Sequence, residues 1–376
     1  MNAPLSQPEN IAQRVLRQDI QSMHAYAIQE SQGMVKLDAM ENPHRLPLQL
    51  QQELGRRLGA LALNRYPGHQ VNTLRAALAA HAGMPDGCDI MLGNGSDELI
   101  SLLAMACDVP ADAQGRPACI LAPVPGFVMY AMSAKLQGLD FVGVPLTADF
   151  ELDEAAMLSA IGTHRPAIVY LAYPNNPTAN LWDDDVIAAI IDAQARAGGL
   201  LVMDEAYQPF ASRSWIDRIR AEPQRHRHVL LMRTMSKFGL AGVRIGYMMG
   251  PKALIAEVDK LRPPYNISVL NSECALFALE HTGVFAAQAA DIRAQREQVL
   301  AALGLMPGVN AYPSQANMIL IRVCGDAARV FDGMKARKVL VKNVSGLHPL
   351  LANCLRLTVG TADENALMLA ALKASL

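Results

Sequence analysis

The segment Gly199-Leu-Leu-Val-Met-Asp-Glu-Ala-Tyr207 contains a short apolar run that is followed by a carboxylate, Asp204. A run that is apolar throughout predicts a strand buried on both faces of a mainly parallel sheet. A second run of this kind, Val229-Leu-Leu-Met232, leads into Ser236-Lys237. Because open α/β sheets bind ligands beyond the carboxyl ends of their strands, we expect Asp204 and Lys237 to face one site.

The same pattern extends from about residue 46 to 265, where short apolar runs alternate with amphipathic helical segments. The other runs lie at residues 90–92, 118–121, 141–144 and 167–171. Alternation of this kind predicts an α/β fold whose mainly parallel sheet is covered by helices on both faces.

Three regions are expected along the chain. Residues 1–45 would form a helix at 11–18 and an extended arm that joins the small domain and a dimer interface, and residues 46–265 would form the large domain. After the helix-breaking Arg262-Pro-Pro264, residues 266–376 would form a smaller αβ domain. Its expected elements are helices at 268–282, 285–304 and 363–375 and strands within 317–323 and 354–360.

Composition and charge exclude several classes of protein. Hydrophobic residues make up 51% of the 376 residues, and the formal net charge of −2 argues against nucleic acid or an anionic membrane as the main partner. No run approaches the roughly 20 apolar residues that cross a bilayer, and the N-terminus lacks the pattern of a secretory signal. The six cysteines form no CxxC pair, and the nine histidines form no metal-ligand set. A cytoplasmic protein that acts on small molecules without a metal is expected.

The carboxylate and the lysine are two of the groups that pyridoxal phosphate chemistry requires. The lysine amine forms a Schiff base with the cofactor, and the carboxylate keeps the pyridine nitrogen protonated so that the ring accepts electrons. Asn176 follows the end of a third strand, and Tyr207 lies three residues after Asp204. Both side chains could therefore reach the phenolic oxygen on the cofactor's pyridine ring. Phe127 could stack on the cofactor ring, although a loop phenylalanine is more often a core residue. An isolated polar residue after a strand is usually a turn residue, but three successive strand ends favour a cofactor site.

Two segments could bind the cofactor's phosphate. Leu92-Gly-Asn-Gly-Ser-Asp-Glu98 predicts a strand, a glycine turn and a helix N-terminus, where backbone N–H groups and the helix dipole favour an anion. The alternative is that Ser96 or Asp97 only caps that helix. Ser236 and Arg244 lie in the glycine-rich segment around the lysine, and an arginine can bind phosphate through two hydrogen bonds. The sequence contains neither a Walker loop nor a GxGxxG motif there, which disfavours a nucleotide.

Four motifs in order resemble those of the fold-type-I (class I/II) pyridoxal-phosphate-dependent aminotransferases. They are Asn175-Asn-Pro-Thr178, Asp204-Glu-Ala-Tyr207, Thr234-Met-Ser-Lys237 and Leu240-Ala-Gly-Val-Arg244. Within that group the chain resembles the histidinol-phosphate aminotransferases at four further segments. These are Leu37-Asp-Ala-Met-Glu-Asn-Pro43, Asn64-Arg-Tyr-Pro67, Gly93-Asn-Gly-Ser-Asp-Glu98 and Cys354-Leu-Arg-Leu-Thr-Val-Gly-Thr361. The resemblance runs from about residue 30 to the C-terminus. It implies a seven-stranded sheet in the large domain and a homodimer with shared active sites.

The resemblance also implies a role for each site residue. Lys237, Asp204 and Tyr207 would be catalytic, with Lys237 bound to the cofactor and Asp204 on its ring nitrogen. Tyr66 would reach the phosphate of the partner's cofactor and the substrate, and Arg356 and Lys342 would bind the substrate's anionic group. The remaining cofactor contacts would come from Ser96, Asp97, Phe127, Asn176, Ser236 and Arg244.

Two departures from the family pattern stand out. Many relatives have one more residue between the lysine and the phosphate-binding arginine, so the turn between Lys237 and Arg244 is expected to be tighter. Many also have an arginine where this chain has Lys342, and lysine neutralises a phosphate only as a point charge.

The implied reaction converts L-histidinol phosphate and 2-oxoglutarate reversibly to 3-(imidazol-4-yl)-2-oxopropyl phosphate and L-glutamate, in histidine biosynthesis. The alternatives of the same fold are an aromatic amino-acid aminotransferase and a phosphothreonine decarboxylase. A different class is a non-catalytic regulatory protein that binds pyridoxal phosphate.

Overall fold

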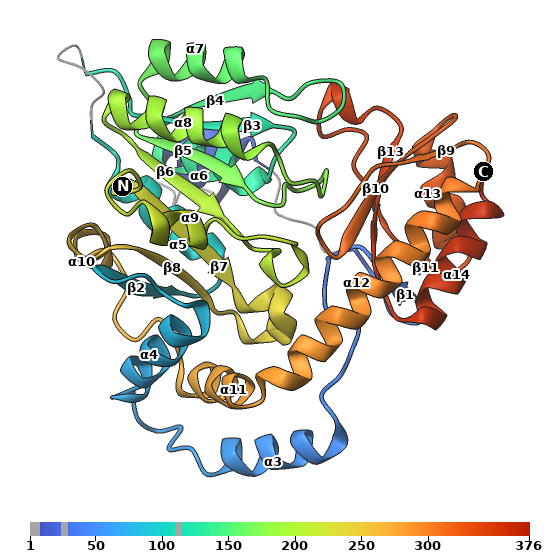
Figure 1. Ribbon diagram of the computed structural model, residues 1–376, viewed down its shortest axis with the longest axis horizontal. Coiled ribbons are helices and arrows are strands. Elements are labelled where there is room, and N and C mark those ends of the chain that lie inside the picture. The colour runs from blue at the N-terminus through green and yellow to red at the C-terminus, as the bar shows by residue number, and fades with distance from the viewer. Residues whose placement is uncertain (1–7, 24–28, 110–114) are drawn as a thin grey trace, which may run out of the picture. The chain divides into compact units, whose positions relative to one another are not determined.

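The computed structural model describes residues 8–23, 29–109 and 115–376 (Figure 1). The chain divides into two compact units, Met1–Gly33 and Met34–Leu376. The first unit contains α1 (Pro8–Val15) and α2 (Gln18–Gln21). The single helix expected at residues 11–18 is therefore wrong in extent, because Arg17 has backbone angles of −56° and 135°, which lie outside the helical region.

The second unit is built around a seven-stranded sheet with the order β2-β8-β7-β6-β5-β3-β4 (Figure 1). The pairings from β4 through β3, β5 and β6 to β7 are parallel, whereas β8 is antiparallel to both β7 and β2. The expected α/β fold with a mainly parallel sheet is confirmed. The strands are β2 (Cys88–Gly93), β3 (Cys119–Val124), β4 (Asp140–Pro145), β5 (Ile168–Ala172), β6 (Leu200–Asp204), β7 (Val229–Thr234) and β8 (Gly246–Pro251).

Alternate residues of the central strands point to opposite faces of this sheet, so each strand serves two cores. In β5, Val169 and Leu171 belong to one core, and Ile168 and Tyr170 belong to the other. The first core is covered by α4 (Gln70–Ala82), α7 (Glu154–His164), α8 (Asp184–Ala197), α9 (Ile216–Ala221) and α11 (Val269–Glu280). The second is covered by α5 (Ser96–Ala106), α6 (Val128–Gln137) and α10 (Lys252–Asp259). The remaining helix of this region, α3 (Leu48–Gly59), packs against α11.

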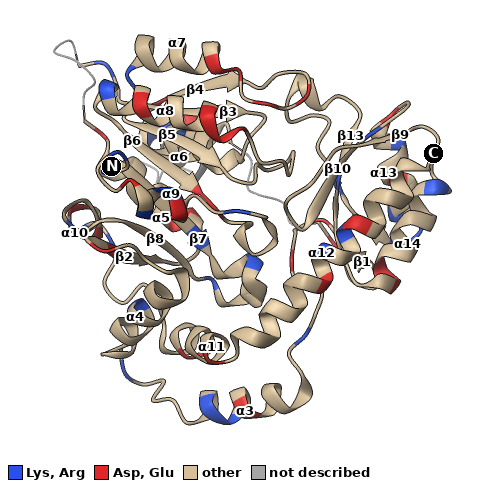
Figure 2. Cartoon of the chain, viewed as in Figure 1, with Lys and Arg blue, Asp and Glu red and all other residues tan. Residues whose placement is uncertain are grey.

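Charged residues are rare on the central strands and frequent on the helices (Figure 2). The five-residue β5 has no charged residue, while β6 and β7 carry only Asp204 and Arg233, at or near their carboxyl ends. Burial of a charge is costly unless it is paired or hydrogen-bonded. These two exceptions therefore mark the strand ends as places where the chain keeps charge for a purpose other than solubility.

A second, four-stranded antiparallel sheet has the order β12-β13-β10-β9, and β1 pairs in parallel with β11 beside it. The arm after residue 33 therefore contributes a strand to the smaller sheets. The strands are β1 (Val35–Lys36), β9 (Val309–Ala311), β10 (Met318–Val323), β11 (Val339–Leu340), β12 (Lys342–Asn343) and β13 (Cys354–Thr358). The helices packed on them are α12 (Thr282–Gly304), α13 (Ala327–Ala336) and α14 (Ala362–Lys373).

Residues 34–376 form one compact unit, so the domain boundaries near residues 45 and 265 remain predictions. Within the described ranges, no helix is both long enough and apolar enough to cross a membrane.

Candidate active site

A cavity of about 360 Å³ opens at the carboxyl ends of the central parallel strands. Its lining includes Ala172, Asp204 and Thr234, which are the last residues of β5, β6 and β7. Lys237 lines the same cavity, so the structure brings the expected amine and carboxylate together. The residues expected from sequence that line it are Ser96, Asp97, Phe127, Asn176, Asp204, Tyr207, Ser236, Lys237 and Arg244.

Lys237 lies in a π-helical turn, η2 (Ser236–Leu240), which begins two residues after the end of β7. Its Nζ donates a hydrogen bond to the backbone carbonyl of Ala39 (3.0 Å) and lies 5.7 Å from the centre of the Tyr207 ring. Burial, followed by the positive charge of Arg356, lowers the pKa of Lys237 to about 8. The amine therefore loses its proton much more readily than an exposed lysine, as a nucleophile or a base requires.

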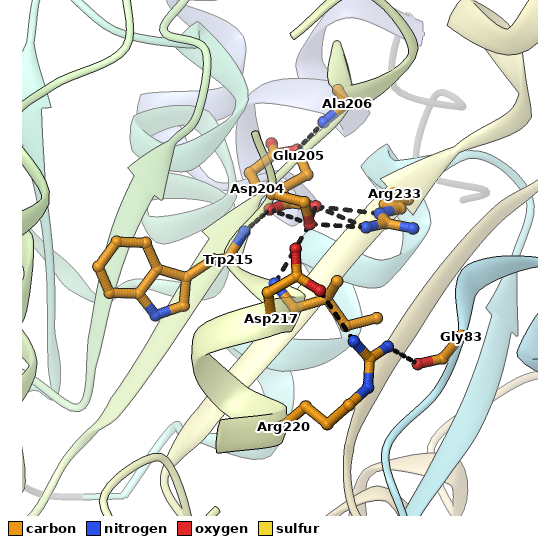
Figure 3. Close-up of polar contacts among 10 residues, drawn as sticks. Gly83, Asp204, Glu205, Ala206, Trp215, Asp217, Arg220 and Arg233 are labelled. Atoms are coloured by element: carbon orange, nitrogen blue, oxygen red, sulfur yellow. Dashed lines mark hydrogen bonds and ion pairs between the residues drawn. The ribbon is translucent and has the colours of Figure 1, made fainter. Parts of the chain in front are cut away.

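Asp204 is buried at the end of β6, and both of its oxygens accept hydrogen bonds. Oδ2 accepts from the Tyr130 hydroxyl (2.7 Å), and Oδ1 accepts from the backbone N–H of Ala206 (3.1 Å), the contact drawn in Figure 3. Burial raises the pKa of Asp204 to about 6, and the hydrogen bond from Tyr130 opposes that rise. The carboxyl group is thus still mainly ionised at neutral pH, and it can stabilise a protonated ring nitrogen.

The N-terminus of α5 forms one end of the cavity. The helix begins at Ser96 itself, and the residue before it, Gly95, makes no side-chain capping bond. Neither Ser96 nor Asp97 caps the helix, so the alternative interpretation of this segment is wrong. A Cβ at Gly246 would lie only 2.5 Å from the backbone nitrogen of Ser96, and glycine there lets β8 approach the helix end.

Arg244 faces this helix end. Its Nη2 lies 3.4 Å from Oδ2 of Asp97, and its Nη1 lies 3.5 Å from Oγ of Ser236. A Cβ at Gly95 would lie 2.6 Å from the guanidinium, so the glycine leaves the space that Arg244 occupies. The lysine and the arginine are joined by η2 and η3 (Ala241–Val243), and Gly239 has a φ of 137°. A guanidinium, hydroxyls and helix N–H groups at one end of a cavity are suited to a phosphate.

Asn176 and Phe127 lie on loops that follow β5 and β3. Asn176 Oδ1 accepts a hydrogen bond from Nη1 of Arg356 (2.7 Å), and Nη2 of Arg356 donates to the carbonyl of Asp38 (2.9 Å). Phe127 directly precedes α6 and meets Tyr130 edge-on, with ring centres 5.6 Å apart. Phe127 is thus exposed to the cavity on one side and packed on the other.

Three expected residues lie outside the lining. Arg356, on β13, is buried and reaches the cavity wall through Asn176. Lys342, on β12, is the register partner of Arg356 and is half-buried. Tyr66 is 78% exposed and stacks on Tyr265, with ring centres 4.5 Å apart. The structure therefore does not bring Tyr66 to the cavity of its own chain.

Further buried residues, which the sequence motifs do not identify, support this site. Glu205 is buried beside Asp204, and its Oε2 accepts from Nε (3.0 Å) and Nη2 (2.9 Å) of Arg233 (Figure 3). The N–H of Trp215 donates to Oε1 of the same carboxylate (2.6 Å). The sequence does contain an indication of this buried ion pair, since Arg233 is the one charged residue in an otherwise apolar run. Nothing in the sequence indicates a polar role for Tyr130, because an aromatic residue at the start of a helix is ordinarily a core residue.

The sequence is also similar to those of known proteins. The profile of the family described as Aminotransferase class I and II matches residues 32–372. The histidinol-phosphate aminotransferase of Polaromonas naphthalenivorans (strain CJ2) is 70% identical over the full length of both chains. That of Methylibium petroleiphilum is also 70% identical, over 96% of this chain and 94% of its own.

Solved structures give the same fold. The histidinol-phosphate aminotransferase from Sinorhizobium meliloti in complex with pyridoxal-5'-phosphate superposes with a TM-score of 0.78, 24% identity and coverage of 99% and 95% of the two chains. The L-threonine-O-3-phosphate decarboxylase from Porphyromonas gingivalis superposes with a TM-score of 0.74, 22% identity and coverage of 90% and 98%. Since both are below 25% identical, these likenesses establish the fold alone.

Proposed function

We propose, since the chain belongs to the class I and II aminotransferases, that it transfers the amino group of L-histidinol phosphate to 2-oxoglutarate. The products are 3-(imidazol-4-yl)-2-oxopropyl phosphate and L-glutamate, the reaction is reversible, and it serves histidine biosynthesis. The two relatives at 70% identity, both named histidinol-phosphate aminotransferase, support this substrate. The structural observation that carries the proposal is that Asp204, which is buried, and Lys237, which is half-buried, face one cavity.

The residues of the cavity fit pyridoxal phosphate at both of its ends. The uncapped N-terminus of α5, Ser236 and Arg244 would bind the phosphate, and glycine at Gly95 and Gly246 lets the Arg244 guanidinium and β8 pack closely against that helix end. At the other end, Lys237 would bind the cofactor covalently. When bound, pyridoxal phosphate supplies a carbonyl carbon for amines and a ring that takes up electrons from the substrate's Cα.

The chain's own residues then hold and move protons. Lys237 has a lowered pKa of about 8, so its Nζ can be neutral at a pH near neutrality and can accept the proton from the substrate's Cα. Asp204 would supply the negative charge that a protonated ring nitrogen requires. Asn176 and Tyr207 line the cavity beside them and would donate hydrogen bonds to the ring oxygen, while Phe127 would cover one face of the ring.

The substrate's phosphate would be bound by Arg356, with Lys342 as a second positive charge. Arg356 is held in place by Asn176 and by the carbonyl of Asp38, so its guanidinium has a fixed orientation. Lys342 is its register partner on β12, which places both residues on the same face of the smaller sheet. Two cations in addition to Arg244 are consistent with a substrate that carries a phosphate of its own.

A homodimer would complete the site. Leu63 (65%), Tyr66 (78%) and Tyr265 (55%) are unusually exposed for large apolar side chains. We propose that a second copy covers them and that Tyr66 reaches the partner's cofactor phosphate. The assembled enzyme would be cytoplasmic.

Glutamate formation from 2-oxoglutarate tests this function. The purified protein is loaded with pyridoxal phosphate and assayed with L-histidinol phosphate, L-phenylalanine or O-phospho-L-threonine as the amine. We expect kcat/KM for histidinol phosphate to exceed that for phenylalanine by about 100-fold or more, the difference that one bidentate charge-assisted contact supplies. A preference for phenylalanine, or release of carbon dioxide from phosphothreonine, would contradict the proposal.

A further inference from the structure

Tyr130 makes the one side-chain hydrogen bond to Asp204 among the described residues. It lies near the start of α6, is only 2% exposed, and donates its hydroxyl to Oδ2 at 2.7 Å. The contact joins a helix on one face of the sheet to the end of β6. Because both partners are buried, water does not compete for this bond, and its loss would leave Oδ2 without that donor.

The ring of Tyr130 is held on two sides. It stacks on Tyr170 of β5, with ring centres 4.3 Å apart and an angle of 8° between the planes. It also meets the edge of Phe127, with ring centres 5.6 Å apart. This packing fixes the direction of the hydroxyl, so the position of Asp204 Oδ2 is determined by a rigid aromatic pair and not by a mobile side chain.

Asp204 needs such a partner because its surroundings disfavour its charge. It is 4% exposed, and the negative charges of Asp97 and Glu205 further favour its protonation. The Tyr130 hydroxyl and the N–H of Ala206 act in the opposite direction and lower the pKa of the carboxyl group. Without the hydroxyl, the carboxylate would both rotate more freely and take up a proton at a higher pH.

We propose that Tyr130 is a positioning residue that holds the Asp204 carboxylate as an oriented anion facing the ring nitrogen of the cofactor. The inference rests on the proposed function, in which Asp204 meets that nitrogen. Tyr130 acts through Asp204 and does not itself line the cavity. Its removal therefore affects cofactor binding and turnover, while the binding of the substrate's phosphate is unchanged.

Tyr130→Phe and Tyr170→Phe form a matched pair of variants. Each removes one buried hydroxyl and keeps its ring in the same stack. The Tyr170 hydroxyl has no hydrogen-bond partner in the part of the chain that the structure describes, so its loss is the control. The dissociation constant of pyridoxal phosphate is measured by fluorescence titration of the cofactor-free protein, and kcat and KM are measured on the loaded enzyme.

For Tyr130→Phe we expect about ten-fold weaker cofactor binding and about ten-fold lower kcat, the effect of one hydrogen bond to a charged group. The KM for histidinol phosphate stays within about three-fold, and the acid limb of the kcat profile moves to higher pH, because the carboxyl group takes up its proton more readily. Tyr170→Phe stays within about two-fold of the unmodified protein in each measurement.

A double-mutant cycle separates this role from a general packing role. On the background of Asp204→Asn, the further change Tyr130→Phe is expected to weaken cofactor binding by less than about two-fold, because the group it acts through is gone. An equal loss on both backgrounds, or an equal loss in Tyr170→Phe, overturns the proposal. Failure of the unmodified protein to bind pyridoxal phosphate or to form glutamate would instead overturn the proposed function.

Discussion

The two sides of the cavity are built differently. On the strand-end side, Asp204 is the last residue of β6 and Lys237 lies three residues after β7, and the parallel sheet places them together. On the small-sheet side, Arg356 comes from β13 and is oriented by Asn176, which lies 180 positions away in sequence. The first side depends on local chain geometry, and the second depends on long-range contacts.

We therefore expect the two sides of the cavity to serve different steps of the reaction. The groups proposed to bind the cofactor and move protons lie on a sheet whose strands are buried on both faces, where small displacements are resisted by close packing. The groups proposed to bind the substrate lie on a separate sheet, with Lys342 on the two-residue edge strand β12 and Arg356 on the neighbouring strand β13. Substitutions on the two sides should therefore affect different steps.

The largest effect is expected from Lys237→Ala. Loss of the amine removes both the covalent anchor of the cofactor and the base for the substrate's Cα, so turnover should fall by about 10⁴-fold or more. The visible absorbance of the lysine-bound cofactor should disappear in the same variant. Activity and absorbance that both persist would show that the strand-end side does not carry the chemistry.

The second prediction concerns the buried pair of Glu205 and Arg233, which joins the ends of β6 and β7. Glu205→Leu leaves the arginine charge buried without its partner, and we expect a loss of about 3–5 kcal/mol in the free energy of unfolding. The exposed pair of Arg225 and Asp192 is a suitable control, since Asp192→Asn should cost at most about 1 kcal/mol. Urea denaturation of the cofactor-free protein measures both. Equal costs would show that the pair is not needed to hold the two strand ends.

The strand-end side was also the more predictable one. Continuous apolar runs predicted β5, β6 and β7 to within two residues, and the polar residues after them predicted the site. These signals are local, because a strand and the turn that follows it are adjacent in sequence. The antiparallel β8 was not predicted, since its segment, Gly246–Pro251, combines glycine and methionine without a strong strand pattern.

Contacts between distant residues could not be predicted from one sequence. Tyr130 lies 74 positions from Asp204, and the carbonyl of Ala39 that accepts the hydrogen bond from Lys237 lies 198 positions away. Nothing in the pattern around either residue identifies its partner. The break of the N-terminal helix at Arg17 was missed for a different reason, because the residues on both sides of it are good helix formers and the backbone of one residue decides the outcome.

The third prediction uses the raised pKa of Asp204, about 6 in the folded protein against an ordinary value of 3.8. Between these values the unfolded chain has already released the proton that the folded protein retains, so stability falls as pH rises from about 4 to 6. Over the whole interval between the two pKa values, this carboxyl group lowers the free energy of unfolding by about 3 kcal/mol. Asp204→Asn should flatten the pH dependence of the melting temperature of the cofactor-free protein in this range. An unchanged slope would show that the carboxyl group titrates normally.

The last prediction compares the two cations of the small-sheet side. Arg356→Ala removes a fixed guanidinium and should raise the KM for histidinol phosphate by about 100-fold, with a smaller change in kcat. Lys342→Ala should raise it by about three- to ten-fold, because a half-buried lysine acts through charge alone and is screened by solvent. The exposed Lys373, at the end of α14, provides a control whose removal leaves KM unchanged.

Lys342→Arg is a further test of this side, because it introduces a planar group with several donors in place of a single ammonium. If Lys342 faces the substrate's phosphate, the arginine should bind at least as well as the lysine, and its advantage over Lys342→Ala should shrink as salt concentration rises. A KM that is the same for arginine, lysine and alanine at this position would leave Arg356 as the only phosphate ligand of the smaller sheet. The small-sheet side of the cavity would then bind the substrate through the guanidinium of Arg356 alone. Selectivity for a phosphate over a carboxylate would have to come from the fixed orientation of that guanidinium.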